Sequence, residues 1–370
     1  MKAYVLNGIA DIAYRDAKMP ELDGNGIVGR NGQTSVPEDE CVIVKVRAAG
    51  VCGSDIPRIY KTGAYHHPLI PGHEFSGEVI SAGSGSLNNF IGKRVGIFPL
   101  IPCRKCSSCK KKLYEMCKNY NYLGSRCDGG FAEYVKVPAT NLIELPENVS
   151  FEQAAMLEPI SVSMHSVRQC GLSLEPDENE RNVSIVISGI GTIGLFTLML
   201  LKGMGYKNIF CIGNKEYQAE YAKSLGIFED RFCNIKNDDP VTFINNVTDG
   251  EGADVYFECV GKNESVSLGL NVLGGGGKLQ LVGNPASDMS FVKDEYWKIL
   301  RNQLKVTGSW NSSFTGEADD DWKLVLKSLE EGKISPEKLI SHRLGFEDLI
   351  KGFEIMRDKT EDYVKVMTLL

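Results

Sequence analysis

The sequence lacks any apolar run of the roughly 18 residues that a membrane-spanning helix requires. Its longest apolar stretch, around Leu195 to Leu201, has the length of part of a buried helix. The first residues, Met1 to Val5, resemble a strand and show no charged segment followed by an apolar one, as an export signal would. We therefore expect a cytoplasmic protein without a membrane partner.

Long basic segments are also missing. The longest run of basic residues is 110–112, and the formal net charge of the 370 residues is −7. An acidic chain without a basic, aromatic-laced face is a poor fit to a nucleic-acid partner. Eleven cysteines are present. In a reducing compartment, clustered cysteines bind metal more often than they form disulfides.

Length and patterning predict two domains of the α/β class. The chain is more than twice the ~150 residues of a typical domain, and its composition, 42% hydrophobic and 24% charged, is ordinary. Up to about residue 160, short β-branched runs predict a small irregular barrel. From 183 to about 306, apolar strands alternate with helices, which predicts a parallel sheet buried on both faces. The tail, with helices at 320–331 and 346–357 and a strand at 364–367, is expected to pack back on the first domain. Residues 23–39 are expected to form a surface loop or loose hairpin.

Residues 52–74 bring metal-binding side chains into one loop-like segment. Cys52 and His73 lie near its ends, with Ser54, Asp55 and Glu74 beside them. Glycines and prolines interrupt any helical or strand period there. Zinc favours thiolate and imidazole ligands, and a catalytic zinc has three protein ligands and one open position. Taken alone, Cys52 and His73 are equally compatible with a buried thiol and a core histidine.

A second group of cysteines has the C-x-x-C-x-x-C spacing followed by a fourth cysteine: Cys103, Cys106, Cys109 and Cys117. Four thiolates at this spacing fit a closed, tetrahedral zinc site, which is structural because no coordination position stays open. An iron–sulfur cluster uses related spacing and is the alternative. The other cysteines show no pattern.

A glycine motif at 189–194 follows a buried strand and opens an apolar helix. Its glycines permit a tight turn and a close backbone approach, so that a pyrophosphate can sit at the helix N-terminus. The next strand ends in Gly213, Asn214 and Lys215, where a NAD-binding unit would have an acidic residue for the ribose 2′-hydroxyl. Lys215 could pair with a 2′-phosphate, although it could also be solvated, with Glu216 beside it. The pattern favours NADP(H) over NAD(H).

Glu158 lies among apolar neighbours just before a helical run. A buried, unpaired carboxylate is costly, so Glu158 needs a metal, a cation or exposure to solvent. The sequence leaves these three possibilities open.

Together these segments resemble the zinc-containing medium-chain dehydrogenases over nearly the whole chain, and most of all their polyol branch. The similarity lies in residues 52–59, 72–77, 124–134, 158–160 and 308–310. It implies a GroES-like irregular β-barrel catalytic domain at 1–165 with a structural-zinc lobe at about 100–120. A Rossmann doubly wound parallel-sheet domain would follow at 166–308, and 309–370 would complete the catalytic domain. Two departures are the long loop at 23–39 and Gly213 in place of an aspartate.

The resemblance also implies roles for individual residues. Catalytic zinc would bind Cys52, His73 and Glu158, with Glu74 close to the metal or exchanging with a ligand, and the four clustered cysteines would hold a second zinc. Ser54 would relay the substrate proton, unless it is a plain turn serine, and Asp55 would orient His73. Cofactor contacts are expected from these residues: Gly189, Gly191, Thr192, Ile193, Gly194, Gly213, Asn214, Lys215, Val260, Val282, Gly283, Ser309 and Trp310.

The expected function is the reversible, zinc-dependent oxidation of a secondary alcohol of a polyol or polyol phosphate to a ketone, with hydride transfer to NAD(P). Arg58, Tyr60 and Arg126 are the candidates for substrate contacts, although surface arginines are usually solvated. One alternative is a dehydrogenase of a threonine-type or bulkier hydrophobic alcohol. Another is a non-catalytic nucleotide-binding relative. The resemblance further implies a homodimer or homotetramer.

Overall fold

The computed structural model describes residues 1–28 and 34–370, and the chain forms two compact units. The first comprises Met1–Glu158, Ser313–Glu331 and Ser335–Leu370, and the second comprises Pro159–Ser312 and Gly332–Ile334. The changeover at residue 158 falls inside helix α4, Leu157–Gln169. The boundaries predicted from the sequence are 165 and 308.

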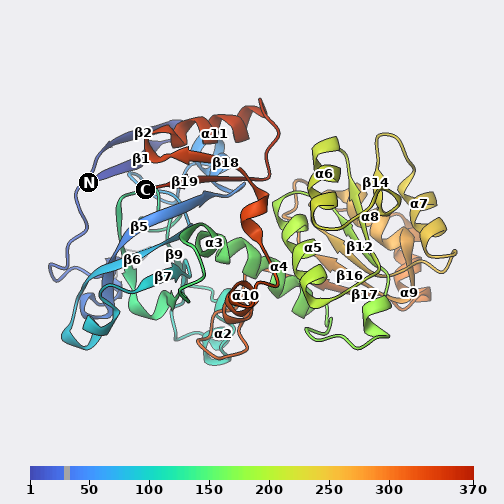
Figure 1. Ribbon diagram of the computed structural model, residues 1–370, viewed down its shortest axis with the longest axis horizontal. Helices are drawn as coiled ribbons and strands as arrows, with labels where there is room; N and C mark the ends of the chain where they lie inside the picture. Colours follow the sequence, from blue (N-terminus) through green and yellow to red (C-terminus); the bar gives the residue numbers. More distant parts are fainter. Residues whose placement is uncertain (29–33) are drawn as a thin grey trace. The chain divides into compact units, whose positions relative to one another are not determined.

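The first unit is built on an irregular sheet in the order β11-β7-β6-β5-β19-β18, with β10 also paired to β5 (Figure 1). Its strands are β5 Cys41–Val51, β6 Glu74–Ala82, β7 Arg94–Ile97, β10 Tyr134–Pro138, β11 Leu142–Glu144, β18 Ile340–Gly345 and β19 Lys365–Leu369. β19 lies antiparallel to β5. The C-terminal segment is therefore part of the sheet that carries the N-terminal half of the chain.

The described part of the first unit also contains three strand pairs and five α-helices. The pairs are β1 Lys2–Gly8 with β2 Asp11–Asp16, β3 Ile27–Val28 with β4 Thr34–Val36, and β8 Leu100–Ile101 with β9 Asn121–Tyr122. The helices are α1 Asp55–Pro57, α2 Ser107–Lys110, α3 Phe151–Ala155, α10 Asp321–Glu330 and α11 Leu349–Asp358. β3 and β4 are the two sides of the hairpin expected within 23–39, whose residues 29–33 lie outside the described part.

The second unit is a six-stranded parallel sheet in the order β14-β13-β12-β15-β16-β17. The strands are β12 Ile185–Ser188, β13 Ile209–Gly213, β14 Phe232–Asn234, β15 Ala253–Glu258, β16 Leu273–Leu281 and β17 Lys305–Gly308. The helices after α4 are α5 Thr192–Met204, α6 Glu216–Ser224, α7 Pro240–Val247, α8 Asn263–Val272 and α9 Lys293–Arg301. This is the doubly wound order 3-2-1-4-5-6, and it confirms the predicted fold class.

Local sequence explains why the central strands and α5 form where they do. Every residue of β12 and β13 is buried, as expected for parallel strands covered by helices on both faces. α5 is apolar along most of its length, and it ends at Gly205 because this residue adopts a φ of 93°, which suits glycine. None of the helices in the described ranges has the length and hydropathy to span a bilayer.

Candidate functional site

The first candidate metal site forms where β5 ends and β6 begins. Cys52 follows the last residue of β5, and His73 and Glu74 stand at the start of β6, which is β5's antiparallel neighbour. Their ligand atoms all lie within 4.8 Å of one another. Gly50 pairs with Glu74 in the strand register, and a Cβ at position 50 would lie 2.4 Å from Oε2 of Glu74. The missing side chain therefore leaves room for this carboxylate.

Asp55 is the buried residue that organises this site. Its Oδ2 accepts the backbone N–H of Cys52 at 3.0 Å. Its Oδ1 lies 2.6 Å from the Arg58 guanidinium and 3.5 Å from Nδ1 of His73. Burial alone would raise the pKa of Asp55, but His73, Arg58 and the Cys52 N–H together hold it below its ordinary value. Asp55 is thus an anion that faces the imidazole, and its role in orienting His73 stays a prediction.

The electrostatics of the site favour a bound cation. Burial would lower the pKa of His73, yet Asp55 and Cys52 raise it well above its ordinary value. The imidazole therefore lies in an anionic environment that a proton or a metal ion would neutralise. Ser54 donates a hydrogen bond to the Cys52 sulfur at 3.3 Å. Thiolate, imidazole and carboxylate are a donor set that fits zinc.

Two carboxylates border the site, and each has a different partner. Glu74 forms a buried ion pair with Lys365 of β19. Glu158, in the first turn of α4, accepts a hydrogen bond from the Tyr122 hydroxyl at 3.0 Å. Burial, reinforced by Glu74 and opposed by His73, raises the pKa of Glu158 to about 7. Glu74 is one of the three residues whose ligand atoms all lie within 4.8 Å of one another, together with Cys52 and His73. Glu158 is not part of this group.

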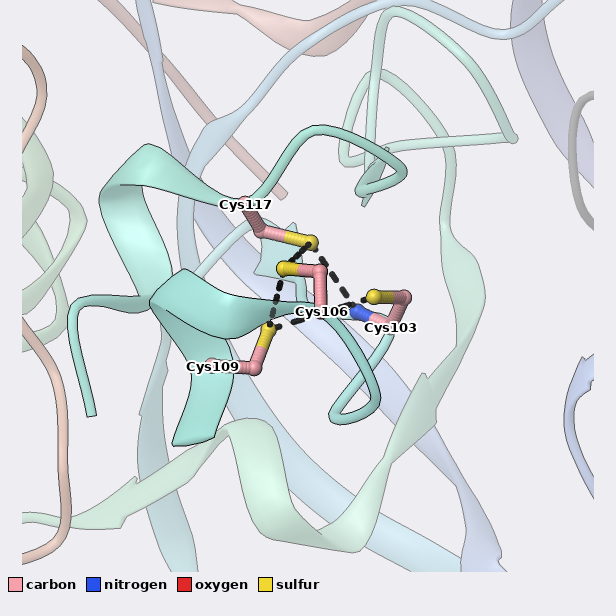
Figure 2. Close-up of side chains that lie close together, drawn as sticks. All are labelled: Cys103, Cys106, Cys109 and Cys117. Atoms are coloured by element: carbon pink, nitrogen blue, oxygen red, sulfur yellow. Dashed lines mark hydrogen bonds between the residues drawn. The ribbon is translucent and has the colours of Figure 1, made fainter. Parts of the chain in front are cut away.

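The second candidate metal site holds the four clustered cysteines (Figure 2). The sulfurs of Cys106 and Cys109 are 3.5 Å apart, those of Cys106 and Cys117 3.9 Å, and those of Cys103 and Cys109 4.0 Å. Four thiolates placed tetrahedrally around zinc at a Zn–S distance near 2.3 Å would be about 3.8 Å apart. Hydrogen bonds from the backbone N–H groups of Cys109 and Lys118 lower the pKa of Cys106 to about 6. The group therefore fits a closed zinc site.

The predicted cofactor residues all follow strands at one edge of the parallel sheet. Gly189 follows β12 with a φ of 92°, and a Cβ there would lie 2.7 Å from Val260. A Cβ at Gly194 would lie 2.1 Å from the carbonyl oxygen of Gly189. Both positions therefore require glycine. Gly191 is the N-cap of α5, and Thr192 and Ile193 are the helix's first two residues.

The other predicted cofactor residues lie at the carboxyl ends of β13, β15, β16 and β17. They are Gly213, Asn214, Lys215, Val260, Val282, Gly283, Ser309 and Trp310. Ser309 stands out because its hydroxyl is buried yet has no hydrogen-bond partner within the described ranges. A buried polar atom of this kind needs a partner. The edge therefore fits a bound dinucleotide.

The end of β13 has little room for an acidic side chain. A Cβ at Gly213 would lie 2.7 Å from the Phe232 ring and 2.8 Å from Oε1 of Gln218. That Gln218 oxygen accepts the backbone N–H of Asn214 at 3.1 Å. Lys215 is the N-cap of α6, and its Nζ lies 5.2 Å from the centre of the Tyr217 ring. The charged side chains that follow this corner in the chain are therefore Lys215 and Glu216, the first residue of α6.

The three predicted substrate residues have different surroundings. Arg58 is paired with Asp55, and Tyr60 lies under the Arg357 guanidinium at 4.6 Å. Arg126 lies between the rings of Tyr65 and Tyr120, 4.6 and 3.8 Å from their centres. Tyr120 in turn contacts Tyr122, the partner of Glu158. A chain of aromatic contacts thus connects Arg126 with the first metal site.

Sequence reasoning missed two residues of the first metal site, Lys365 and Tyr122. Lys365 is 291 positions from Glu74, and Tyr122 is 36 positions from Glu158. No local pattern could have paired these residues: Lys365 reaches Glu74 because β19 and β6 both pair with β5, and Tyr122 of β9 reaches Glu158 of α4 only in the folded chain. The pairing of Asp55 with Arg58 had a local signal, because residues three apart on a helical turn are neighbours.

Two family models match the chain. The alcohol dehydrogenase GroES-like domain matches residues 38–147, and the zinc-binding dehydrogenase model matches residues 192–331. Galactitol 1-phosphate 5-dehydrogenase of Escherichia coli K12 is 34% identical over 89% of this chain and 93% of its own length. L-idonate 5-dehydrogenase of Vitis vinifera is 33% identical over 85% and 84% of the two chains. The crystal structure of galactitol-1-phosphate dehydrogenase from Escherichia coli superposes with a TM-score of 0.87 at 30% identity, covering all of both chains.

Proposed function

Because the chain belongs to the zinc-containing medium-chain dehydrogenases, in their polyol branch, we propose that it reversibly oxidises a secondary alcohol of a polyol phosphate to a ketone. The chain is a zinc-dependent oxidoreductase of secondary alcohols. The observation that supports this chemistry most directly is the close group of a half-buried thiol, Cys52, with the buried side chains of His73 and Glu74, beside Glu158. Its donor atoms suit a zinc ion that keeps one position open for substrate.

We propose two zinc ions per chain. The first would be held by Cys52, His73 and a carboxylate, with Glu158 as the ligand and Glu74 beside the metal or exchanging with it. The second would be held by Cys103, Cys106, Cys109 and Cys117. When bound at the first site, zinc supplies a Lewis acid that lowers the pKa of the substrate hydroxyl.

The chain's own residues would handle the substrate proton. Ser54, whose hydroxyl lies 3.3 Å from the Cys52 sulfur, is placed to accept that proton and pass it outward. Asp55 keeps His73 in a fixed orientation through the contact between Oδ1 and Nδ1. Nicotinamide, when bound by the second unit, supplies the hydride acceptor.

Arg126 supports a phosphorylated substrate. Its guanidinium is held in place by Tyr65 and Tyr120 and by a hydrogen bond to the Tyr120 carbonyl oxygen at 2.8 Å. Guanidinium groups bind phosphate well because their N–H donors match its oxygens. Arg58 is less suited to this role, since Asp55 already neutralises it. Tyr60 is tied to Arg357 in the same way.

NADP(H) is the proposed cofactor in preference to NAD(H). Lys215 supplies the positive charge that a 2′-phosphate needs, and a side chain at position 213 would meet Phe232 and Gln218, which leaves little room for the carboxylate of an NAD-type site. We also propose a homo-oligomer, a homodimer in its simplest form. The cytoplasmic location expected from the sequence stays a prediction.

The test is a set of initial rates with zinc-loaded protein, using galactitol 1-phosphate, sorbitol and threonine, each with NAD and NADP. We expect turnover of the phosphorylated polyol with NADP, and a large rise in its KM in Arg126→Ala. Activity on sorbitol alone would overturn the phosphate site, and activity on threonine alone would favour the threonine-type alternative. Protein that binds nucleotide but contains a single zinc and turns over no alcohol would be a non-catalytic relative.

A further inference from the structure

Glu258 is a buried carboxylate that none of the roles above uses. It is the last residue of β15, its side chain is 1% exposed, and no ion pair to it is found within the described ranges. Its Oε1 accepts two backbone N–H groups, from Val260 at 2.8 Å and from Gly261 at 2.9 Å. Burying an unpaired carboxylate is costly unless hydrogen bonds compensate it. Here the compensation comes from the loop that follows the strand.

The same residue also binds the loop that follows β16. The main-chain carbonyl oxygen of Glu258 accepts the N–H groups of Val282 and Gly283, both at 2.9 Å. Glu258 thus fixes the backbone of both segments, 259–261 through its side chain and 282–284 through its carbonyl group. We call these two segments the paired loops.

Glycines allow the paired loops to pack in direct contact. A Cβ at Gly261 would lie 1.9 Å from the carbonyl oxygen of Asn284. A Cβ at Gly283 would lie 2.2 Å from the nitrogen of Gly261 and 2.8 Å from Oε2 of Glu258. The backbone N–H of Ala286 also donates to the Gly261 carbonyl oxygen at 2.9 Å. There is no spare space between the loops, so a change in one would move the other.

The paired loops border the glycine turn at the edge where a dinucleotide binds in this fold class. Glu258 is paired in register with Ser188, the residue before Gly189, and Val260 lies against Gly189. In a doubly wound sheet the first three strands bind one mononucleotide and the last three bind the other. The glycine turn and Lys215 belong to the first half. β15, β16 and the paired loops belong to the second half, which would bind the nicotinamide mononucleotide.

We propose that Glu258 is a positioning residue that holds the paired loops in the shape required by the nicotinamide half of the cofactor. The proposal rests on the proposed function, because it requires that the second unit binds a nicotinamide dinucleotide. The carboxylate of Glu258 acts on the backbone of Val260 and Gly261, where Gly261 packs directly against Gly283 and Asn284, and it has no role in the binding of the adenosine half. Loss of its carboxylate should therefore weaken the binding of the whole cofactor selectively.

The experiment measures dissociation constants by calorimetry for two probes, NADPH and 2′,5′-ADP, which contains the adenosine half alone. In Glu258→Ala we expect NADPH binding to weaken at least tenfold and 2′,5′-ADP binding to change less than twofold. Glu258→Gln keeps an acceptor oxygen for the two N–H groups and should restore NADPH binding to within about threefold of the unmodified protein. Asp254→Ala is the control, since Asp254 binds Ser184 at the opposite end of β15.

A second pair of variants tests the same geometry without removing the carboxylate. Gly283→Ala forces a Cβ into the paired loops and should cause the same selective loss of NADPH binding. Gly275→Ala, on β16 with no atom within 4 Å of the added Cβ, should change neither constant. Equal losses for both probes, or unchanged NADPH binding in Glu258→Ala and Gly283→Ala, would overturn the proposal. If the unmodified protein binds neither NADPH nor NADH, the proposed function itself fails.

Discussion

At the residue scale, the first metal site is a set of buried charges with unequal partners. Asp55 faces a guanidinium and an imidazole, and Glu74 faces the Lys365 ammonium group. In the described part of the chain, the hydrogen-bond partner of Glu158 is the neutral hydroxyl of Tyr122, and burial raises the pKa of Glu158 to about 7. A cation placed between these groups would stabilise the ionised form of Glu158 most, since Asp55 and Glu74 already have charged partners. This asymmetry supports the assignment of Glu158 as the zinc ligand.

The ion pair between Lys365 and Glu74 should matter for stability. Lys365 is 1% exposed, and its ammonium group also donates to the carbonyl oxygen of Val51 at 3.2 Å. Removing one partner of a buried ion pair leaves a buried charge, which costs about 3–5 kcal/mol. We therefore expect Lys365→Met to lower the free energy of unfolding of the zinc-free protein by about that amount. Urea unfolding followed by fluorescence measures it.

Two further measurements separate this effect from simple loss of packing. Zinc should raise the melting temperature of Lys365→Met more than that of the unmodified protein, because the metal supplies the missing positive charge. The double variant Lys365→Met/Glu74→Gln should be less destabilised than the sum of the two single variants. Strict additivity would show that the two charges do not interact.

Lys215 should determine cofactor choice through its charge. A hydrogen bond to a charged group contributes about 1.5–3 kcal/mol, and the lower value corresponds to a change of about tenfold in affinity. We expect Lys215→Ala to raise the KM for NADP by about that factor and to leave the KM for NAD nearly unchanged. Lys223→Ala, an exposed lysine later on α6, is the control. Equal changes for both cofactors would remove Lys215 from 2′-phosphate recognition.

At the element scale, the features that could be predicted from the sequence are those whose residues lie close together along the chain at a regular spacing. The apolar strands and the glycine motif identified the parallel sheet, and the fold class is confirmed by the strand order. The regular spacing of the four cysteines likewise allowed a metal site to be predicted there, and the structure brings their sulfurs together. Long-range pairings had no such signal: Lys365 reaches Glu74 only because β19 lies beside β5. The role of Glu258 could not be predicted, because an acidic residue at the end of an apolar strand does not indicate that two loops bind it.

The cysteine lobe is an element whose structure should depend on its metal. Its regular structure is short, since α2 is four residues long and the 3₁₀ turn at Tyr114–Met116 has three, so the four sulfurs are expected to be its main connection. We expect Cys109→Ser to lose one of two zinc ions per chain and to make the lobe sensitive to proteolysis near residues 103–117. Metal analysis and limited proteolysis with mass spectrometry measure both effects.

The control for the lobe is Cys170→Ser, since Cys170 is a buried thiol in the second unit. This variant should keep both zinc ions and the original cleavage pattern. If Cys109→Ser also keeps two zinc ions and resists proteolysis, the cysteine cluster does not hold the second metal.

At the scale of the whole molecule, the exposed apolar side chains concentrate in one stretch of the second unit. They lie on and around α9 and β17, and we call them the α9 patch: Phe291, Val292, Tyr296, Trp297, Leu300 and Val306. β17 is the last strand of its sheet, and no strand in the described ranges pairs with its outer edge. An apolar patch beside an unpaired edge strand is a surface that proteins normally cover.

A second copy of the chain is the partner that suits the α9 patch. α9 begins with the acidic residues Asp294 and Glu295 and ends with the basic residue Arg301. In a two-fold dimer whose axis crosses the helices at right angles, the two helices run antiparallel, so the acidic start of one faces the basic end of the other. β17 of the two copies could also pair edge to edge, which would continue the sheet across the dimer.

We therefore expect Trp297→Asp to convert the protein to a monomer, because it places a charge at the centre of the α9 patch. Sedimentation velocity at micromolar concentration measures the change in mass. Phe228→Asp is the matched control, since Phe228 is a more exposed aromatic residue of the same unit, 68% against 49% for Trp297, and lies outside the patch. It should leave the oligomer intact. If the unmodified protein is already a monomer, or if Trp297→Asp keeps the oligomer, the subunits meet elsewhere and the α9 patch has another role.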